Sequence, residues 1–321
     1  MVKQSILVIG GAGYIGSVCS HKLIEEGHNV IVFDNLSKGL LTLIPNRAKF
    51  IKGDICDERA LDNLFSSHVI DAVIHFAAAK DAGESMKVPS KYVDNIQGTC
   101  NILKAMEKYN VTKIVYSSSA AVYGALQKEG LVDETHPTEP LNFYGFSKLE
   151  GERLIKWYCD LKKFSGVCLR YFNVAGDGGL YYVDPNAKNI FPILAEVLSG
   201  KRKQLEIFGS DYKTQDGTGV RDYIHVIDLV DAHIKALSLS GSFQTINLGS
   251  QKGYSVLELV KAFEKASKKK LPYIMCPRRE GDPALLVASS QKAKMLLNWE
   301  AKHTLDQMVE STLRAYKKSL P

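Results

Sequence analysis

No stretch of the sequence is apolar over about 18 residues, the length that a membrane-spanning helix needs. We therefore predict no membrane partner. The first 16 residues, MVKQSILVIGGAGYIG, hold only a short apolar run that glycines interrupt, whereas a secretory signal peptide requires a longer apolar core. The expected location is therefore the cytoplasm.

The cysteines lack the spacing of a metal site. Six are present, but no pair is spaced C-x-x-C and none has a histidine at metal-ligand spacing. Disulfides are also rare in cytoplasmic proteins of this length. We expect reduced, structural thiols at Cys19, Cys56, Cys100, Cys159, Cys168 and Cys276, and we predict no metal site.

The charge is too balanced for a nucleic-acid-binding protein. Lysine and arginine total 41 against 35 acidic residues, a net charge of +6, and part of the excess sits in the tracts Lys268–Lys270 and Lys317–Lys318. No basic stripe alternates with aromatic residues, so we predict no nucleic-acid partner. A mild positive balance suits a small anionic substrate.

The composition is that of a globular protein, with 45% hydrophobic and 24% charged residues in 321. Short β-branched runs alternate with helical segments through the first half. We expect strands at Ile6–Ile9, Val30–Phe33, Phe50–Lys52, Ala72–His75, Lys113–Ser117 and Val167–Tyr171, and helices at Tyr14–Glu26, Glu58–Phe65, Ser90–Tyr109 and Tyr144–Lys162. This alternation predicts an α/β fold, a Rossmann-type doubly wound parallel sheet.

The pattern changes after Asn173, where Gly176–Gly179 and Pro185 mark an irregular loop. The expected helices beyond it are Ile190–Ser199, Ile227–Ser238, Ser255–Ala266 and Thr304–Lys317, with strands at Leu205–Phe208, Thr245–Leu248 and Tyr273–Cys276. We predict a first domain over residues 1–172, to which segments near 222–250 return, and a smaller C-terminal α/β substrate domain over residues 173–321.

A glycine-rich turn directly follows the first strand. Gly10, Gly13 and Gly16 form the pattern G-x-x-G-x-x-G before the first helix. The first glycine permits a tight turn, the second lets the backbone approach a pyrophosphate, and the third lets the helix pack on the strand. The free N–H groups and positive dipole of the helix N-terminus then favour phosphate.

A carboxylate, Asp34, ends the second strand, 18 residues after Gly16. It can accept hydrogen bonds from adenosine ribose hydroxyls and repels a 2′-phosphate, which favours NAD over NADP. Lys38 lies close enough in sequence to permit weak use of NADP. Asp54 and Ile55 end the third strand, where they could frame an adenine ring.

The pair Tyr144 and Lys148 begins a helix as Y-x-x-x-K, so both side chains share one helix face. A lysine ammonium beside a phenol favours the phenolate and lowers its pKa, which would make Tyr144 a general base. The pattern Y-x-x-x-K is common in proteins, so alone it does not identify a catalytic site. The serines Ser117, Ser118 and Ser119 at the end of the fifth strand strengthen it, because one of them could hydrogen-bond a substrate hydroxyl.

These motifs resemble those of the extended short-chain dehydrogenase/reductase family, nearly from end to end. The matching stretches are GGAGYIGS, DNLS, HFAAAKDAGES, NIQGT, SSSAAVYG, YGFSK, LRYFN, IFGSDYKTQDGTGVRDYIHV and PRREGD. The last two resemble family members that epimerise nucleotide sugars. The resemblance implies inversion of C4 of UDP-glucose and UDP-galactose, through a 4-keto sugar and tightly held NAD.

The resemblance also implies roles for individual residues. Ser119, Tyr144 and Lys148 would be catalytic. The cofactor would contact Gly10, Gly13, Tyr14, Ile15, Gly16, Asp34, Asn35, Asp54, Ile55, Phe76, Ala77, Ala78, Lys80, Asn95, Ser117, Tyr144, Lys148 and Tyr171. The UDP-sugar would contact Lys80, Ser119, Tyr144, Phe172, Asn173, Asn189, Ile207, Phe208, Arg221, Arg279, Asp282 and Leu286. A homodimer, with the helices at 90–109 and 144–162 packed across a two-fold axis, is also implied.

Three departures from the family pattern bear on specificity. Ala121 replaces the hydroxyl residue that some relatives carry two positions after the serine, and the loop VAGDGGLYYVDPNAKN after Asn173 diverges. Leu286 stands where the family limits the room at the sugar's 2-substituent. Its intermediate size leaves the acceptance of N-acetylated sugars open, and it could instead pack in the core.

Other activities on this fold remain alternatives. Dehydratases and decarboxylases place acidic residues just after the strand-end serine, where this chain has Ala120 and Ala121, which cannot transfer protons. Epimerisation of UDP-xylose, UDP-arabinose, UDP-glucuronate or UDP-GlcNAc is the main alternative. A non-catalytic NAD-sensing protein is disfavoured, because the Ser, Tyr and Lys set is complete.

Overall fold

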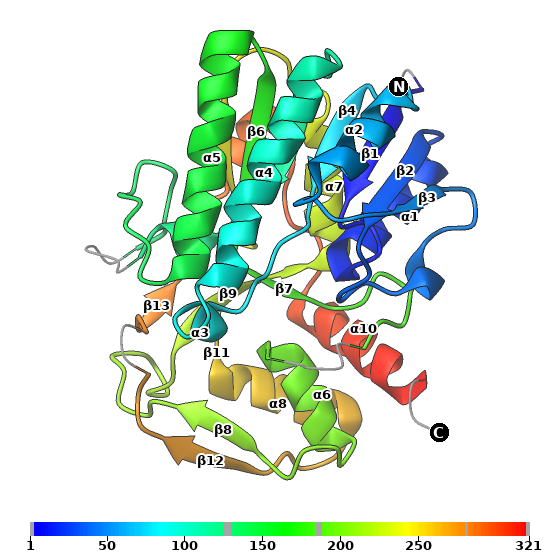
Figure 1. Cartoon of the computed structure of the whole chain (residues 1–321). Helices are drawn as coiled ribbons and strands as arrows, with labels where there is room; N and C mark the ends of the chain where they lie inside the picture. The colour runs from blue at the N-terminus through cyan, green and yellow to red at the C-terminus, as the bar shows by residue number, and fades with distance from the viewer. Residues whose placement is uncertain (1–2, 125–129, 184–187, 280–281, 319–321) are drawn as a thin grey trace.

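The computed structural model describes residues 3–124, 130–183, 188–279 and 282–318 (Figure 1). Pro185, and Glu280 and Gly281 of the PRREGD stretch, lie outside these ranges. A seven-stranded sheet dominates the fold, and every strand pair in it is parallel. The α/β fold and the parallel sheet predicted from the sequence are therefore confirmed.

The order of strands across the sheet is β10-β6-β5-β4-β1-β2-β3. The strands are β1 (Ser5–Ile9), β2 (Asn29–Asp34), β3 (Lys49–Lys52), β4 (Ala72–His75), β5 (Lys113–Ser117), β6 (Ser165–Tyr171) and β10 (Gln244–Leu248). The chain leaves β1 toward β3 and then returns to place β4 on the other side of β1. Reversal of strand order opens a crevice at the carboxyl ends of β1 and β4, where such sheets bind ligands.

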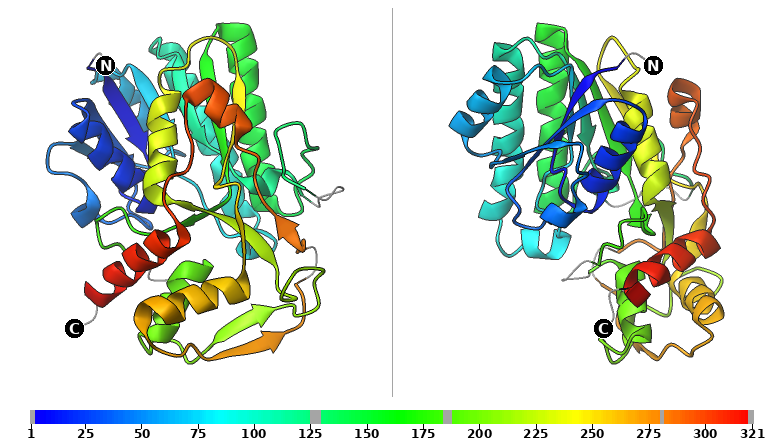
Figure 2. Two further views of the ribbon diagram at one scale, coloured as in Figure 1. Left: turned by 180° about the vertical axis from the view of Figure 1, so that it is seen from behind. Right: turned by 90° about the vertical axis from the view of Figure 1, so that its right-hand side faces the viewer.

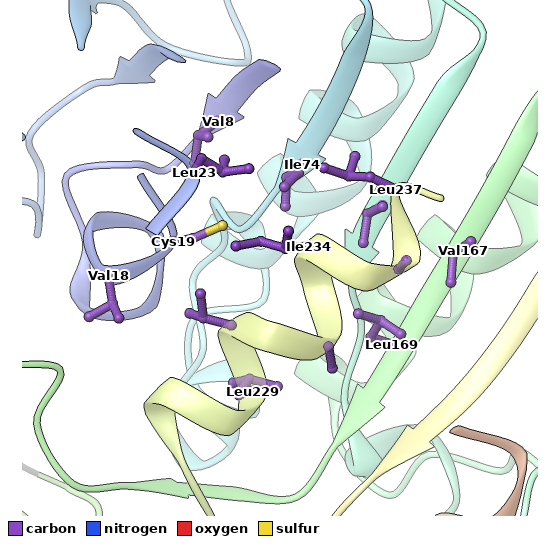
Figure 3. Packing of buried hydrophobic residues seen from close by; sticks show 14 of the residues in the cluster. Val8, Val18, Cys19, Leu23, Ile74, Val167, Leu169, Leu229, Ile234 and Leu237 are labelled. Carbon is purple, nitrogen blue, oxygen red and sulfur yellow. The ribbon is translucent and has the colours of Figure 1, made fainter. Parts of the chain in front are cut away.

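Helices cover both faces of the sheet. One face carries α1 (Tyr14–Glu25), α7 (Val226–Ala236) and α9 (Gln291–Leu297). The other carries α2 (Glu58–Ser66), α4 (Ser90–Lys108) and α5 (Phe143–Lys162). Strands buried on both faces read as continuous apolar runs, as SILVI in β1 does. Figure 3 shows Val8, Leu23 and Ile234 among the side chains that fill the first interface.

A smaller part of the chain lies beyond the carboxyl ends of the strands. Its strands are β7 (Asn173–Ala175), β8 (Leu205–Phe208), β9 (Val220–His225), β11 (Gly253–Ser255), β12 (Tyr273–Cys276) and β13 (Leu285–Leu286). Its helices are α6 (Ile190–Leu198), α8 (Val256–Ser267) and α10 (Leu305–Lys318), which share a hydrophobic cluster (Figure 2). Short turns of helix, α3 (Ala82–Ser85), η1 (Leu41–Leu43) and η2 (Ala120–Val122), complete the described elements.

The expected elements were all found, with ends displaced by at most two residues. The sequence analysis missed β7, β9, β11, β13 and α9, because four of them are only two to seven residues long and β9 mixes buried and charged residues. β10 lies beside β6 at the edge of the main sheet. The boundary at residue 172 stays a prediction. No helix in the described ranges is long and apolar enough to cross a bilayer.

Candidate active site

The glycine-rich turn lies at the carboxyl end of β1, next to the ends of β2 and β4. Gly10 has a φ of +80°, which L side chains rarely adopt, and a Cβ there would meet the backbone N of Ala77 at 2.6 Å. Its N–H donates to the carbonyl of Phe33 at 2.8 Å. The turn is therefore held against both neighbouring strand ends, β2 and β4.

The helix after this turn is suited to a pyrophosphate. Gly13 is the N-cap of α1 and no described side chain caps the helix, so its first N–H groups remain available to an anion. A Cβ at Gly13 would meet only the Gly10 carbonyl at 3.4 Å, so this glycine leaves the turn open to a ligand. A Cβ at Gly16 would instead collide with that carbonyl. These features fit NAD.

Carboxylates lie at the ends of β2 and β3, as predicted. Asp34 is 9% exposed and accepts the N–H groups of Ala12 at 3.0 Å and Leu36 at 2.8 Å. Asn35 donates to Asp54 at 2.8 Å. The pKa of Asp54 is lowered by the N–H of Cys56 and then by Asn35. Hydrogen bonds thus fix both carboxylates at the edge where an adenosine would lie.

The segment after β4 is held to α4 by Asn95. This side chain is 4% exposed and exchanges hydrogen bonds with the backbone of Ala79, accepting at 2.8 Å and donating at 3.0 Å. It also donates to Ser147 Oγ at 3.0 Å. Asn95 therefore orients residues 76–79, while Lys80 is exposed. Direct contact of Asn95 or Lys80 with NAD stays a prediction.

The predicted catalytic residues meet at the carboxyl end of β5. Lys148 is 2% exposed, and its Nζ donates to the carbonyl of Ser117 at 2.8 Å. Ser119 lies close enough to the Tyr144 phenol to lower its pKa. Ser119 also accepts the N–H of Ala121 at 3.2 Å, because it caps η2. The spacing on α5 thus places a phenol, an ammonium and a hydroxyl at one site.

The expected effect of Lys148 on Tyr144 is wrong for this structure. Burial raises the pKa of Tyr144, and Ser119 lowers it by less. Burial also lowers the pKa of Lys148 to about 7, although Cys168 and Glu152 oppose this. The sequence shows the pairing but not the burial, and here burial has the larger effect.

A buried network that the sequence analysis did not identify lies behind the serines. Arg170 on β6 pairs with Glu152 on α5 at 2.6 Å, and both side chains are at most 6% exposed. Ser118 donates to the same carboxylate, and Arg170 donates to the hydroxyl of Tyr123 at 3.1 Å. Glu152 lies one turn after Lys148, but only the fold reveals its partner. The network fixes the segment that carries Ser119.

Ser117 has a second supporting contact. His233 on α7 lies with its Nε2 at 3.0 Å from Ser117 Oγ, and its Nδ1 at 2.9 Å from the carbonyl of Leu229. Burial lowers the pKa of His233 to about 4, so the ring is neutral near pH 7. Tyr171 lies against the same ring at 6.1 Å between centroids. The cofactor roles of Ser117 and Tyr171 stay predictions.

Two predicted phosphate ligands lie on the smaller part. Arg221 on β9 pairs with Asp282 at 2.5 Å, and its other terminal nitrogen donates to the carbonyl of Val220 at 2.8 Å. Arg279 is exposed and lies 3.9 Å from the centroid of the Phe208 ring. Because it has no ion-pair partner among the described residues, Arg279 can offer its guanidinium to phosphate oxygens.

The remaining predicted substrate residues differ in their exposure. Ile207 is 1% exposed within a hydrophobic cluster, and its contact with the substrate stays a prediction. Phe172 is 7% exposed and shares a smaller cluster with the half-buried Leu286. Asn173 donates to the carbonyl of Asp222 at 3.0 Å. Asn189 is exposed at the start of α6 and leaves its helix uncapped.

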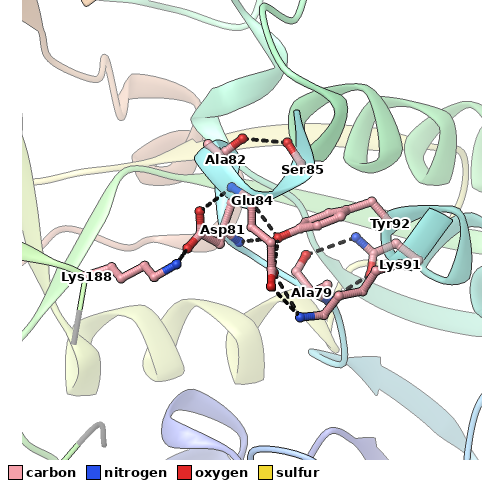
Figure 4. A network of polar contacts seen from close by, with 9 residues as sticks. Ala79, Asp81, Ala82, Glu84, Ser85, Lys91, Tyr92 and Lys188 are labelled. Atoms are coloured by element: carbon pink, nitrogen blue, oxygen red, sulfur yellow. Dashed lines mark hydrogen bonds and ion pairs between the residues drawn. The ribbon is translucent and has the colours of Figure 1, made fainter. Parts of the chain in front are cut away.

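An ion pair joins the two parts beside the site. Lys188, next to Asn189, pairs with Asp81, which follows Lys80 (Figure 4). Asp81 also caps α3 through the N–H of Glu84 at 2.8 Å. Tyr92 donates to the carbonyl of Asp81 at 2.7 Å and to Glu84 at 2.8 Å. Predicted ligands of the cofactor and of the substrate are thereby held near each other.

Comparison with known proteins agrees with this geometry. Residues 6–249 match the model of the NAD dependent epimerase/dehydratase family. The chain is 45% identical to a UDP-glucose 4-epimerase of Bacillus subtilis, over 97% of this chain and 96% of that protein. It is 42% identical to a UDP-glucose 4-epimerase of Drosophila melanogaster, over 98% and 97%. A Bifidobacterium longum UDP-glucose 4-epimerase crystallised with NAD⁺ and UDP has a TM-score of 0.92, with 39% identity and 98% of both chains covered.

Proposed function

Because the chain belongs to the NAD dependent epimerase/dehydratase family, we propose that it is a UDP-glucose 4-epimerase, an isomerase that interconverts UDP-glucose and UDP-galactose with NAD as cofactor. The observation that carries this proposal is the meeting of Ser119, Tyr144 and Lys148 at the carboxyl end of β5. A proton acceptor beside a nucleotide-binding crevice is the arrangement that oxidation of a sugar hydroxyl requires.

Tyr144 takes the proton of the sugar 4-hydroxyl, and Ser119 hydrogen-bonds that oxygen. NAD, when bound, supplies a hydride acceptor for C4 and a positive charge that favours the Tyr144 phenolate. Lys148 holds the carbonyl of Ser117 and keeps the strand end in place. The proton returns to the sugar oxygen together with the hydride, which the reduced cofactor would give back to the opposite face of C4 once the hexose has turned over. C4 then has the opposite configuration, with no net oxidation.

The UDP moiety supplies the binding energy, so that the hexose can turn. Arg279 and Arg221 are the residues for the diphosphate, since a guanidinium grips phosphate oxygens with two parallel hydrogen bonds. Asp282 orients Arg221 through their ion pair. Asn173 and Asn189 complete the proposed substrate contacts, together with Phe208 beneath Arg279.

Substrate choice rests on the residues around the sugar. Ala120 and Ala121 form η2 directly after Ser119 and provide no acid or base for dehydration or decarboxylation. Leu286 is half-buried against the cluster that contains Phe172, so it restricts space while remaining partly accessible. We infer that hexoses are preferred and that UDP-GlcNAc is a poorer substrate.

The same proposal includes a homodimer that works in galactose metabolism in the cytoplasm. Support for the dimer comes from α5, where Phe146, Trp157 and Leu161 are exposed. They are separated by 11 and 4 residues and therefore share one helix face. Support for a reducing compartment comes from the six cysteines, all of which are free thiols.

The decisive experiment gives the purified protein UDP-galactose without added cofactor and follows the anomeric protons by NMR. We expect UDP-glucose to appear until a stable mixture remains, which requires both 4-epimerase activity and retained NAD. UDP-galactose that stays unchanged even after NAD is added would overturn the hexose assignment. Parallel samples of UDP-GlcNAc, UDP-xylose and UDP-glucuronate then identify the sugar.

A further inference from the structure

The loop that diverges from the family pattern lies directly on the glycine-rich turn. The hydroxyl of Tyr14, the first residue of α1, donates to the carbonyl of Gly176 at 2.5 Å, across 162 residues of sequence. The ring of Tyr182 stacks on the ring of Tyr14, with centroids 5.6 Å apart and planes 19° apart. Two different interactions therefore fasten one loop to the helix N-terminus that receives the pyrophosphate.

The backbone of the loop is shaped to lie close to α1. A Cβ at Gly178 would overlap the side chain of Val18, which lies one turn after Tyr14. Gly176 and Gly179 have φ values of +83° and +86°, which larger side chains adopt only with strain. The run Gly176–Gly179, which the sequence showed only as an irregular loop, is therefore needed for contact with the helix.

Asp177 holds the loop in one conformation. Its carboxylate is 7% exposed and accepts the N–H groups of Gly179 at 2.9 Å, Tyr181 at 3.2 Å and Tyr182 at 3.3 Å. Its own N–H donates to Ser311 Oγ of α10 at 3.1 Å. Asp177 thus orients the segment that carries Tyr182 through its carboxylate and ties the loop to α10 through its backbone N–H.

Tyr14 stays a hydrogen-bond donor over the range of pH in which enzymes work. Burial raises its pKa, and the charge of Asp177 raises it further. The segment that leaves β7 passes beside α1 before the chain reaches α6 (Figures 1 and 2). A bound dinucleotide would have its pyrophosphate at the turn that this segment borders.

We propose that Tyr14 and the loop 176–182 form a clasp that slows the release of NAD. The proposal rests on the proposed function, in which the hydride taken from C4 must return to the same sugar. Loss of the cofactor between these steps would leave a 4-keto sugar, so slow release is a requirement of the reaction. Tyr14 is therefore a positioning residue that acts on retention of NAD and takes no part in proton transfer.

The test measures how fast NAD leaves the protein. Enzyme loaded with NAD is passed through a desalting column, diluted and sampled over time, and the NAD still bound is quantified by chromatography after heat release. Tyr14→Phe removes the hydroxyl and keeps the stacked ring. We expect release to be about fivefold faster, the factor that corresponds to one net hydrogen bond.

Two further variants define the clasp. Tyr182→Leu removes the stacking partner and should also speed release, and the double variant should show less than the product of the two factors, because both changes open one loop. Tyr181→Phe is the matched control. It loses a hydroxyl in the same loop, and that hydroxyl makes no hydrogen bond with the residues that the structure describes, so release should keep the wild-type rate.

The outcomes separate the clasp from the proposed function. If the wild-type protein binds NAD and Tyr14→Phe releases it at the wild-type rate, the clasp is overturned and the epimerase proposal stands. If the wild-type protein binds no NAD, both are overturned. Hydrogen exchange of residues 177–182 without NAD supplies a second readout, which should be faster in Tyr14→Phe; unchanged exchange would contradict the clasp.

Discussion

Tyr144 is the residue on which the proposed chemistry depends most directly. Tyr144→Phe removes only the hydroxyl that exchanges the proton of the sugar, and positioned acid–base groups contribute about 10²–10⁴-fold in rate. We therefore expect kcat for UDP-galactose to fall at least 100-fold with the fold and bound NAD retained. Steady-state kinetics and the NAD content of the purified variant measure both.

The matched control is Tyr158→Phe, the same change further along α5. Tyr158 packs on the ring of Phe164 at 5.4 Å between centroids, distant in sequence from the catalytic end of the helix. Its activity should equal that of the wild type. A Tyr144→Phe variant with more than a tenth of wild-type kcat would assign the proton transfer to another group.

Lys148 is held at a cost in stability, because its ammonium is buried with one carbonyl partner and the face of Tyr116 at 4.8 Å. Its pKa falls from 10.5 to about 7 on folding, so the penalty is complete below pH 7 and disappears as pH rises from 7 to 10.5. Lys148→Met should inactivate the enzyme yet raise the free energy of unfolding at pH 6 by about 2 kcal/mol.

Urea unfolding of the NAD-free protein at pH 6, 8 and 10 measures this gain, which should shrink as the pH rises. The control Lys156→Met changes an exposed lysine of α5 that pairs with Asp160 at 2.5 Å. Surface pairs of this kind contribute little, so it should show no such pH dependence. A gain that is equal at all three pH values would contradict the burial of a charged Lys148.

Sequence alone predicted which residue types occupy the site, but not how they are solvated. Gly10, Gly13 and Asp34 were predicted from spacing, because their roles follow from backbone geometry at a strand end. The direction of the Tyr144 pKa shift could not be predicted from spacing, since burial depends on residues far away in sequence. For the same reason the pairs Arg170–Glu152 and Tyr14–Gly176 became visible only in the fold.

At the scale of elements, the pair Arg170–Glu152 connects β6 to α5 behind the segment that carries Ser118 and Ser119. Arg170→Met leaves the Glu152 carboxylate buried without its cation, and breaking a buried pair costs about 3–5 kcal/mol. Urea denaturation should show this loss. The double variant Arg170→Met, Glu152→Leu should recover much of it, because two apolar side chains can replace a buried pair.

The recovery of stability in the double variant allows the role of the pair in stability to be separated from its role in positioning the serines. If the double variant is stable but its kcat is reduced with KM unchanged, the pair positions Ser118 and Ser119 for the reaction. A single variant that loses less than about 1 kcal/mol would show that the pair behaves like a surface contact, contrary to the exposure of its side chains.

The elements of the main sheet were predicted well because their signals are local. Residues Ile6–Ile9 of β1 form an unbroken apolar run. In the smaller part the signal of α8 is local too, because the helix begins with a capping box between Ser255 and Glu258. The short strands β7 and β13 have no such signal, since two or three residues show no periodicity. Their pairing with β9 exists only because distant segments meet.

For the whole molecule, local sequence patterns do not predict the order of strands or the path of the chain. Nothing in the sequence of β10 indicates that it pairs with β6. In this pairing Gln244 lies beside Val167, which is 77 residues earlier in the sequence. A parallel partner needs only a right-handed crossover, which several arrangements satisfy. The smaller part is therefore interrupted by an element of the main sheet.

The last prediction concerns assembly. Trp157 and Leu161 are 63% and 69% exposed on α5, and α5 packs along α4, where Val93 is 47% exposed. Exposed apolar side chains on neighbouring helices indicate an interaction surface, and a two-fold axis would place the same face on each partner. Trp157→Glu should therefore convert a dimer into a monomer, as measured by sedimentation equilibrium.

Met295→Glu is the control, because Met295 is 75% exposed on α9, which covers the opposite face of the sheet. It should leave the dimer intact. α5 also carries Tyr144 and Lys148. Separation of the partners should therefore lower the melting temperature of the whole protein, this helix included. A wild-type chain that sediments as a monomer at micromolar concentration would contradict this interface, because the exposed face would then be stable in water without a partner.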